Sequence, residues 1–581
     1  MKRFYSKHST RTYKWRVQQV KAMLTMLTSN MSLFQAALLT DLGKCSVEAQ
    51  LTEITTMVLD CKEVLQKLAS WMRSEDVGSP LLLAPAFLEI RFEPRGVCLV
   101  IGPFNYPVTL TLGPVISALA AGNPVVIKPS DLCPAVANLL TKLIPTYFDP
   151  EVVNVVNGAI PETTELMRNE WGLVFFTGSE RVGKIIAGQA AATMSPVVLE
   201  LGGKSPLIIC EDIPEMKAMC NRIIWGKSIN AGQTCVAPDY VLCHEKNAEE
   251  VLREMKNSLE VMFRGNQRHS EDYGRNVSRA HTQRLYDMMV EAEEAGVEVV
   301  VGGSELIDVA DRYCPTCIVR VDPRKHSNLR IMNEEIFGGI LVFFTVSSDE
   351  ESIEYVKNVP GTPLAIYVFT SNSKTFERIA NSCPSGGLVR NDTLVHFATN
   401  SLPFGGLGSS GYGTAHGIHG FKTFSHHRAV LNKPCHFAFE YQGLRYAPYD
   451  KMMLVGGSGK MFCRLLALLP SIPPVAKLTR PAFLISFGMT IALSIEPPAG
   501  LFSYMVYFVI SMGLVTLMLR WKIWGKRLRN LQFERNNVGG IEGGSELSRR
   551  SSAGFMHTND TENVTNNNVF YMEEGDEHGR I

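Results

Sequence analysis

Short, largely apolar runs separated by helical stretches recur through the first part of this chain. They lie at residues 96–101, 124–127, 152–156, 173–176 and 197–201. Strands that are apolar on both sides need cover on both sides, which intervening helices supply in parallel sheets. The pattern therefore predicts an α/β fold built on a doubly wound parallel sheet.

A second alternation of the same kind begins at residues 207–209 and continues through residues 299–301 and 340–345. Before the first sheet, residues 13–74 repeat apolar side chains at three- and four-residue steps, which predicts helices. We expect two doubly wound parallel-sheet domains joined by a small bridging or oligomerisation element. The predicted boundaries are 1–203, 204–400 and 401–435.

Polar residues follow several predicted strands. Asn105 comes shortly after the first run, Lys128 ends the second, and the GxxxxG segment Gly178–Gly183 follows the run at 173–176. Parallel sheets bind ligands beyond the carboxyl ends of their strands, and glycines at a strand-to-helix junction can admit phosphates. Each residue also has a plainer explanation, namely a turn residue, a solvated lysine and a simple helix entry.

A cysteine and a carboxylate stand out in the middle of the chain. Cys235 ends the stretch Asn230-Ala231-Gly232-Gln233-Thr234-Cys235, and Glu200 lies in Leu199-Glu200-Leu201-Gly202-Gly203-Lys204. Thiols attack carbonyl carbons, and a carboxylate can take a proton from water, so we predict a nucleophile at Cys235 and a base at Glu200. The chain has 13 cysteines, and a single cysteine is more often a small buried apolar residue. The assignment therefore depends on the other motifs.

The motifs occur in one characteristic order, and that order resembles the aldehyde dehydrogenase superfamily over about residues 10–435. They are Asn105-Tyr106-Pro107, Lys128-Pro129-Ser130, Thr177-Gly178-Ser179, Leu199-Glu200-Leu201-Gly202-Gly203-Lys204, Gly232-Gln233-Thr234-Cys235 and Glu334-Glu335-Ile336-Phe337-Gly338. The segments Cys235-Val236-Ala237-Pro238-Asp239-Tyr240 and Leu402-Pro403-Phe404-Gly405-Gly406 are similar to the class 3 branch of that superfamily.

The resemblance implies a role for each matching residue. Cys235 would attack an aldehyde carbon, Asn105 would hold the oxyanion, and Glu200 would activate water to release the acid. Glu335 is a second candidate for the base. The first domain would bind NAD, with NADP as an alternative, and the second would carry the catalytic cysteine. The expected cofactor-binding residues are Lys128, Gly178, Ser179, Val182, Gly183, Glu335 and Phe337.

One position bears on the choice of cofactor. Asp131 follows Lys-Pro-Ser, where class 3 relatives usually carry Glu. A carboxylate here would favour a free ribose 2′-hydroxyl and repel a 2′-phosphate, so we expect NAD. The shorter Asp side chain leaves NADP open. No His/Cys grouping typical of zinc sites is apparent, so no metal is expected.

The composition changes beyond the catalytic region. We expect a linker at 436–480, a membrane anchor at 481–519 and a disordered tail at 530–581. Residues 501–519 form an uncharged run long enough for a transmembrane segment, with basic residues directly after it. Both a single span at 501–519 and a hairpin that includes 481–495 remain open.

This apolar region makes the resemblance strongest to the membrane-bound, fatty-aldehyde-oxidising members of the branch. Without a recognisable signal peptide, the catalytic part is expected on the cytosolic side. The endoplasmic reticulum is the expected membrane, with the peroxisome and the mitochondrial outer membrane as alternatives. The expected partners are a long-chain aldehyde, membrane lipid and a second copy in a homodimer.

The balance of 57 basic and 57 acidic residues gives no reason to expect nucleic acid. Three other functions remain open: oxidation of another aldehyde class, acyl transfer to CoA, and a catalytically silent membrane scaffold. Retention of Glu200 favours hydrolysis over CoA transfer. A silent scaffold is expected to lose the thiol, the base or the amide, and all three are present.

Overall fold

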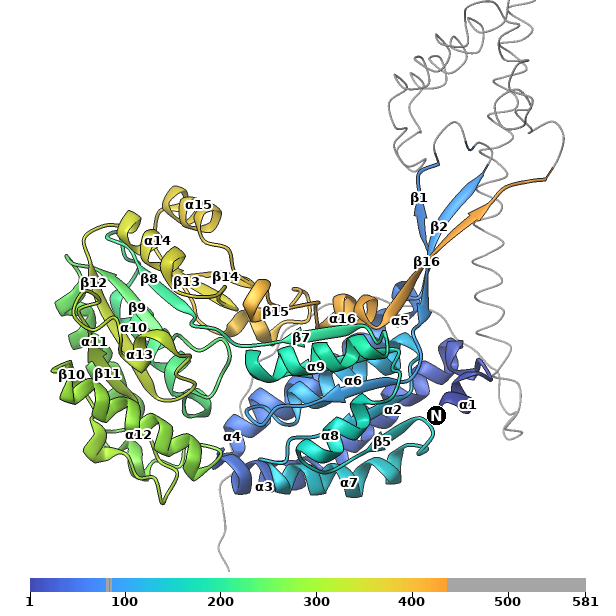
Figure 1. The fold of residues 1–581 in the computed structure, drawn as a ribbon, viewed down its shortest axis with the longest axis horizontal. Coiled ribbons are helices and arrows are strands. Elements are labelled where there is room, and N and C mark those ends of the chain that lie inside the picture. Colours follow the sequence, from blue (N-terminus) through green and yellow to red (C-terminus); the bar gives the residue numbers. More distant parts are fainter. Residues whose placement is uncertain (80–82, 84–85, 436–581) are drawn as a thin grey trace, which may run out of the picture. The chain divides into compact units, whose positions relative to one another are not determined.

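The computed structural model describes residues 1–79, 83 and 86–435, and the strands in this part of the chain form three sheets (Figure 1). The first is a six-stranded sheet in the order β15-β7-β6-β3-β4-β5. Its strands are β15 (Gly411–Tyr412), β7 (Val197–Glu200), β6 (Leu173–Thr177), β3 (Cys98–Ile101), β4 (Val125–Lys128) and β5 (Val153–Val155). The five strands from the N-terminal part are parallel, as predicted, whereas β15 runs antiparallel to β7.

The second sheet has seven strands in the order β10-β11-β12-β9-β8-β13-β14. They are β10 (Glu298–Val301), β11 (Cys317–Arg320), β12 (Ile340–Val346), β9 (Tyr240–His244), β8 (Pro206–Ile209), β13 (Ala365–Phe369) and β14 (Gly387–Arg390). All neighbours are parallel except β10, which pairs antiparallel with β11 at one edge. The α/β fold with parallel sheets is thus confirmed.

The third sheet is the bridging element, and it draws on distant parts of the chain. It consists of β1 (Glu75–Val77), β2 (Phe87–Pro94) and β16 (Ser425–Asn432), which lie side by side in Figure 1. The structure therefore departs from the predicted boundaries in two places. Residues 75–77 and 87–94 form the third sheet together with β16, and residues 411–412 extend the first sheet. Strand pairing over such distances leaves no local sequence signal.

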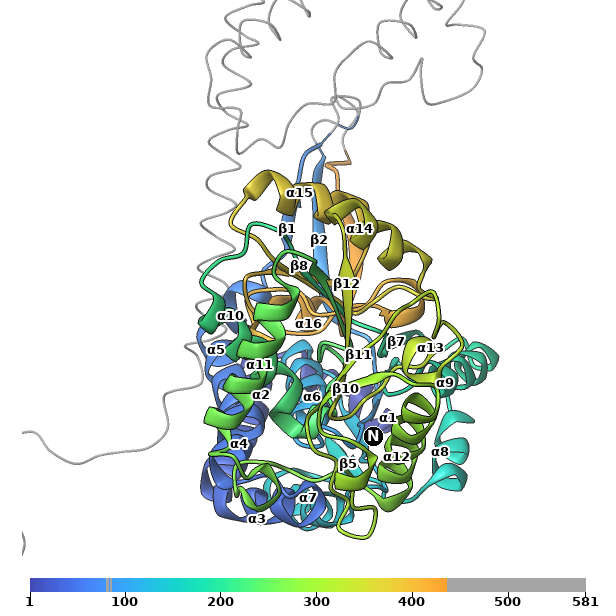
Figure 2. The same ribbon diagram turned by 90° about the vertical axis from the view of Figure 1, so that its left-hand side faces the viewer.

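Helices cover both faces of the two large sheets. They are α1 (Lys2–Tyr5), α2 (Tyr13–Ser29), α3 (Met31–Leu42), α4 (Ser46–Ala49), α5 (Thr55–Trp71), α6 (Thr109–Ala121), α7 (Pro134–Tyr147), α8 (Ile160–Met167), α9 (Glu180–Ala192), α10 (Met216–Ser228), α11 (Ala248–Met262), α12 (Arg279–Glu294), α13 (Arg330–Asn333), α14 (Asp349–Asn358), α15 (Ser373–Ser382) and α16 (Gly417–Thr423). On the seven-stranded sheet, α10 and α11 lie next to each other and pack on one face, as Figure 2 shows. Helices α12, α14 and α15 supply apolar residues to the other face.

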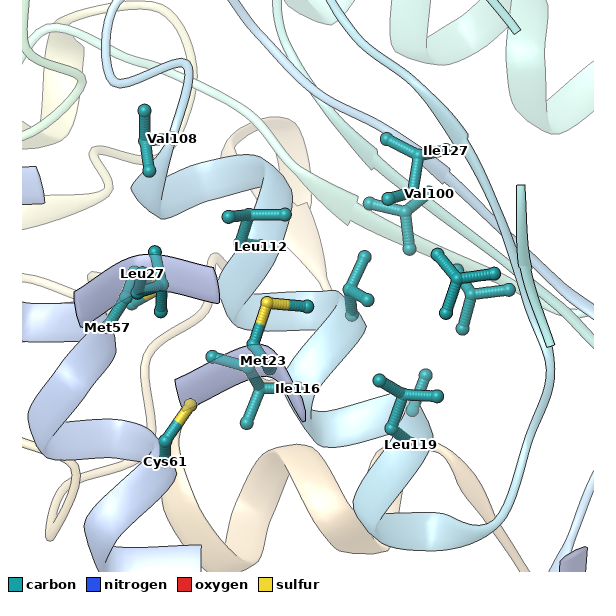
Figure 3. Close-up of a cluster of buried hydrophobic side chains, with 14 of the residues drawn as sticks. Met23, Leu27, Met57, Cys61, Val100, Val108, Leu112, Ile116, Leu119 and Ile127 are labelled. Atoms are coloured by element: carbon teal, nitrogen blue, oxygen red, sulfur yellow. The ribbon is translucent and has the colours of Figure 1, made fainter. Parts of the chain in front are cut away.

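The largest core lies between the six-stranded sheet and the N-terminal helices. Figure 3 shows α6 in its middle, with Leu112 and Ile116 among the buried side chains and Val100 on the sheet beside them. Met23 from α2 and Met57 from α5 pack against the same helix. Burial of each such side chain stabilises the fold by roughly 1.5–3 kcal/mol. Because α6 is enclosed by the sheet and by other helices, it is apolar almost all round.

Within the described residues, no single helix is long and apolar enough to cross a membrane. Helices α2 and α3 reach the required length and composition only as a pair, bent by 68°, and both supply side chains to the core of the six-stranded sheet. The predicted linker, membrane anchor and tail lie outside the described residues.

Candidate active site

A cavity of about 640 Å³ opens at the carboxyl ends of the first sheet. This size is typical of cofactor and ligand sites. The strand register brings the ends together, since Ile101 pairs with Lys128 and Thr177 pairs with Glu200. The predicted residues that line the cavity are Asn105, Lys128, Gly178, Ser179, Val182, Glu200, Cys235, Glu335 and Phe337. Gly183 is the one predicted site residue that does not line it.

Gly183 instead packs behind the cavity wall. It is buried in α9, and a Cβ atom at this position would lie 2.8 Å from Leu201 Cδ2. The glycine allows the helix to approach Leu201, the residue after strand β7, and its role in cofactor binding stays a prediction. Ser179 caps α9 by accepting a hydrogen bond from the Val182 N–H. The N-terminus of this helix therefore borders the cavity, where its free N–H groups favour an anion.

The loop that carries Cys235 has an unusual backbone. Asn230, Ala231 and Gly232 follow one another with φ values of 53°, 52° and 76°. A Cβ at Gly232 would lie 2.2 Å from the main-chain oxygen of Gly338, so only glycine fits. The backbone at Gly232 thus lies close to the loop that follows Glu335. The Cys235 side chain is half-buried and faces the cavity.

Asn105 is buried, and two side chains hold its loop. Its main-chain oxygen accepts hydrogen bonds from Asn230 Nδ2 at 2.8 Å and from Lys44 Nζ at 3.1 Å. The hydroxyl of the neighbouring Tyr106 forms a hydrogen bond of 2.9 Å with the hydroxyl of Thr234, the residue directly before Cys235. The Asn105 and Cys235 loops are therefore joined by side chains from each.

The Lys44 side chain that binds the Asn105 loop belongs to a fully buried ion pair. Lys44 Nζ lies 2.6 Å from Glu53 Oε1, and both side chains are inaccessible to solvent. Glu53 Oε2 also accepts hydrogen bonds from the N–H groups of Val108 and Thr109, at the start of α6. Glu53 lies in a π-helical turn, Gln50–Ile54, between α4 and α5. Neither Lys44 nor Glu53 belongs to one of the sequence motifs above. The π-helical turn is the signal that points to Glu53, since such turns are frequent near functional sites.

Glu200 is the last residue of β7 and is almost completely buried. Neither of its carboxylate oxygens has a hydrogen-bond partner among the described residues. Burial raises the pKa of Glu200 well above its usual range. A buried carboxylate without protein partners is poised to bind a polar group or water within a cavity.

Glu335 lies in the segment after α13, and its Oε1 accepts a hydrogen bond from the Gly203 N–H at 3.0 Å. Burial raises the pKa of Glu335 to about 7. Burial, together with the charges of Glu335 and Glu200, raises the pKa of the Cys235 thiol to about 12. The thiol is therefore protonated at neutral pH, and a base must take its proton before it can attack.

Lys128, Phe337 and Asp131 also line the cavity on the side expected to hold the cofactor. Lys128 is buried at the end of β4 and donates a hydrogen bond to the Pro129 carbonyl at 2.7 Å, while burial lowers its pKa. Phe337 adopts a φ of 50° and packs edge-on against Phe104, with ring centroids 5.6 Å apart. Asp131 also lines the cavity, so its carboxylate can influence the choice of nucleotide.

A second, smaller cavity of about 40 Å³ lies behind the first. Glu200, Leu201 and Cys235 line both cavities and so form part of the wall between them. The other lining residues are mostly apolar, including Met57 and Phe404. The thiol and the unpartnered carboxylate can thus be reached from two sides.

Comparison with known proteins identifies the sequence pattern. The model of the aldehyde dehydrogenase family matches residues 2–430. Aldehyde dehydrogenase family 3 member H1 of Arabidopsis thaliana is 41% identical over 452 residues, covering 78% of this chain and 91% of the relative. The dimeric NADP-preferring aldehyde dehydrogenase of Rattus norvegicus is 39% identical over 430 residues, covering 74% and 92%. The substrate-bound structure of AldH from Staphylococcus aureus aligns with a TM-score of 0.74 and 38% identity, covering 80% and 97%.

Proposed function

The chain belongs to the aldehyde dehydrogenase family, and from this premise we propose that it oxidises long-chain aliphatic aldehydes to carboxylic acids at a membrane surface. Aldehyde dehydrogenases oxidise aldehydes with NAD or NADP, which fits the large cavity at the end of the first sheet. One observation carries the proposal. The Cys235 thiol, the unpartnered Glu200 carboxylate and the loop of the buried Asn105 line the same cavity.

The residues around the first cavity suit a dinucleotide. The N-terminus of α9 borders the cavity and can receive a phosphate. Ile160 in α8 and Ile185 in α9 line it although their side chains are 81% and 52% exposed, so a flat ring would cover apolar surface there. The carboxylate of Glu335 can accept hydrogen bonds from ribose hydroxyls. A bound nicotinamide, with its ribose held by Glu335, would supply the acceptor for the hydride of the aldehyde carbon.

The chemistry at the thiol follows from the surrounding groups. The Cys235 sulfur attacks the aldehyde carbon and loses its proton to a base, forming a thiohemiacetal. The Asn105 amide and the main-chain N–H of Cys235 stabilise the resulting oxyanion. Loss of hydride leaves a thioester, and Glu200 takes a proton from the water that hydrolyses it. We assign Glu335 to the cofactor, with a role as base as the alternative.

The apolar second cavity supports an aliphatic substrate. Its present volume of about 40 Å³ is small, since one water molecule needs about 10–15 Å³ on the same measure. A long alkyl chain therefore requires the lining side chains to move apart. Each methylene buried from water contributes roughly 0.8 kcal/mol, so a widened apolar channel would select long substrates.

We extend the proposal to location and assembly. The run at 501–519 would anchor the chain in a membrane, alone or as a hairpin with 481–495, where fatty aldehydes concentrate. The catalytic part would face the cytosol at the endoplasmic reticulum, with the peroxisome and the mitochondrial outer membrane as alternatives. A homodimer is proposed because the rat relative is named dimeric.

The test is a series of aldehydes from hexanal to hexadecanal, offered with NAD and with NADP to the full chain in lipid vesicles. We expect kcat/KM to rise by up to about fourfold for each added methylene until the channel is filled. The Cys235→Ala variant should bind cofactor but lose turnover of every aldehyde. A kcat/KM independent of chain length would contradict the fatty-aldehyde proposal, and appreciable turnover by Cys235→Ala would remove Cys235 from the mechanism.

A further inference from the structure

Three motifs that contribute site residues also contain charged residues without a role in the mechanism above. Lys204 ends the motif that carries Glu200, Asp239 follows Cys235 by a few residues, and Glu334 precedes Glu335. The structure brings the first two together, with Lys204 Nζ 2.9 Å from Asp239 Oδ2. Both side chains are almost completely buried, at 7% and 4% exposed.

This ion pair holds the backbone on both sides of Glu335. Lys204 Nζ donates a hydrogen bond to the carbonyl of Glu334 at 2.8 Å. The N–H of Ile336 donates to both carboxylate oxygens of Asp239, at 3.3 Å each. The two residues that flank Glu335 in the chain are thus bound to the two members of one ion pair.

Further hydrogen bonds also restrict the position of Glu335. Its carboxylate accepts from the Gly203 N–H, next to Lys204 in the chain. Arg284 donates to the Glu335 carbonyl at 3.2 Å, and Lys204 donates to the Ile331 carbonyl at 2.9 Å. Side-chain freedom of Glu335 is limited by this framework, which crosses from the loop after β7 to the segment after α13.

We propose that Lys204 and Asp239 are positioning residues, which hold the Glu335 carboxylate in the orientation that binds the cofactor ribose. The inference rests on the proposed role of Glu335. A buried ion pair is a poor source of stability, because desolvation offsets most of the attraction between its charges. Its fixed charges can instead set the direction of the peptide groups that they bind, which an apolar pair of the same volume cannot do.

Lys227 provides a matched control. Its side chain is fully buried, and its Nζ lies 3.7 Å from the other oxygen of Asp239. It has no hydrogen-bond partner among the described residues and so does not hold the Glu335 segment. Lys227→Met and Lys204→Met each remove one buried positive charge beside Asp239, but only the second releases the Glu334 carbonyl.

The first measurement is the affinity for NAD without aldehyde, by isothermal titration calorimetry on the full chain in detergent. We expect Lys204→Met to raise the Kd at least tenfold and Lys227→Met to change it less than twofold. In a Glu335→Ala background, Lys204→Met should add no further loss. Equal weakening by both lysine variants, or full additivity with Glu335→Ala, would overturn the proposal.

The second measurement is amide hydrogen exchange over residues 331–338 in the cofactor-free protein. Lys204→Met should accelerate exchange there at least tenfold, while Lys227→Met leaves it as in the wild type. Exchange unchanged by Lys204→Met overturns the proposal. If exchange accelerates but Glu335→Ala leaves the Kd for NAD unchanged, the assigned role of Glu335 fails instead. Should Lys204→Met not fold, Asp239→Asn is used, with the same direction expected and the same result overturning the proposal.

Discussion

Asn230 donates a hydrogen bond of 2.8 Å from its side-chain amide to the main-chain carbonyl of Asn105. The residue that begins the cysteine loop therefore fixes the loop of the proposed oxyanion donor. Lys44, which lies between helices α3 and α4, donates a second hydrogen bond to the same carbonyl at 3.1 Å. Catalytic geometry at Cys235 thus depends on residues that take no part in the chemistry.

The Asn230→Gly variant should remove the side-chain amide while the backbone keeps its conformation. Asn230 adopts a φ of 53°, which glycine tolerates without strain. The substitution therefore removes the two hydrogen bonds of the side-chain amide, to the main-chain carbonyls of Asn105 and Gln233. We expect kcat/KM to fall about tenfold, equivalent to ~1.4 kcal/mol of transition-state stabilisation. Asn391→Gly is the control, since Asn391 also has a positive φ, of 58°, and bonds main chain away from both cavities. An equal loss in the two variants would contradict the prediction.

Glu200→Gln should slow hydrolysis of the thioester rather than its formation. Removal of a general base typically costs a factor of about 100 or more. In rapid-mixing experiments with hexadecanal, we expect a full burst of reduced cofactor followed by a steady state at least 100-fold slower than in the wild type. If Glu335→Gln shows this behaviour and Glu200→Gln does not, the role of base passes to Glu335.

Glu335 should make the stability of the fold depend on pH. Burial raises its pKa from 4.5 to about 7, so the folded protein binds this proton more tightly than the unfolded chain does. The stabilisation is fully present below pH 4.5 and is lost as the pH rises through about 7. The slope can reach at most about 1.4 kcal/mol per pH unit.

The check is urea unfolding of the wild type and Glu335→Gln between pH 4.5 and 8. As the pH rises through this window, the free energy of unfolding of the wild type should fall relative to that of Glu335→Gln. A difference that is independent of pH would show that Glu335 titrates normally in the folded protein.

Two glycines in α9 should respond oppositely to alanine. A Cβ at Gly183 would lie 2.8 Å from Leu201 Cδ2, whereas a Cβ at Gly188 would meet nothing within 4 Å. We expect Gly188→Ala to stabilise the protein by up to about 1 kcal/mol, because alanine favours helix. Gly183→Ala should destabilise it by about 1–3 kcal/mol, as overpacking does. Thermal unfolding checks both, and a stabilising Gly183→Ala would contradict the packing role.

Some features escaped the sequence analysis for physical reasons. Helix α6 begins at Thr109, where the carboxylate of Glu53, far earlier in the chain, accepts hydrogen bonds from the N–H groups of Val108 and Thr109. Cys314 and Cys317 have CxxC spacing, which the sequence analysis overlooked. Both are buried, and the neighbouring Cys317 thiol together with burial raises the pKa of Cys314 well above its usual range, as expected of unreactive thiols.

Local pattern alone was enough to place the five parallel strands of the first sheet and the polar residues at the ends of several of them. Apolar runs of strand length and glycines at strand-to-helix junctions are local features, and parallel pairing then carries Lys128, Thr177 and Glu200 to one edge. The cavity also collects Cys235, Glu335 and Phe337 from loops of the second domain, and of the predicted site residues only Gly183 does not line it.

Only the tertiary structure decided which groups support the site. Lys44 and Asn105 lie 61 positions apart, and Lys204 and Glu334 lie 130 apart, so no local spacing predicts their contacts. The pairing of β2 with β16 likewise joins segments that are far apart in the chain, since Pro94 pairs with Ser425. Local patterns report which face of an element is buried, whereas the choice of partner follows from packing the whole chain at once.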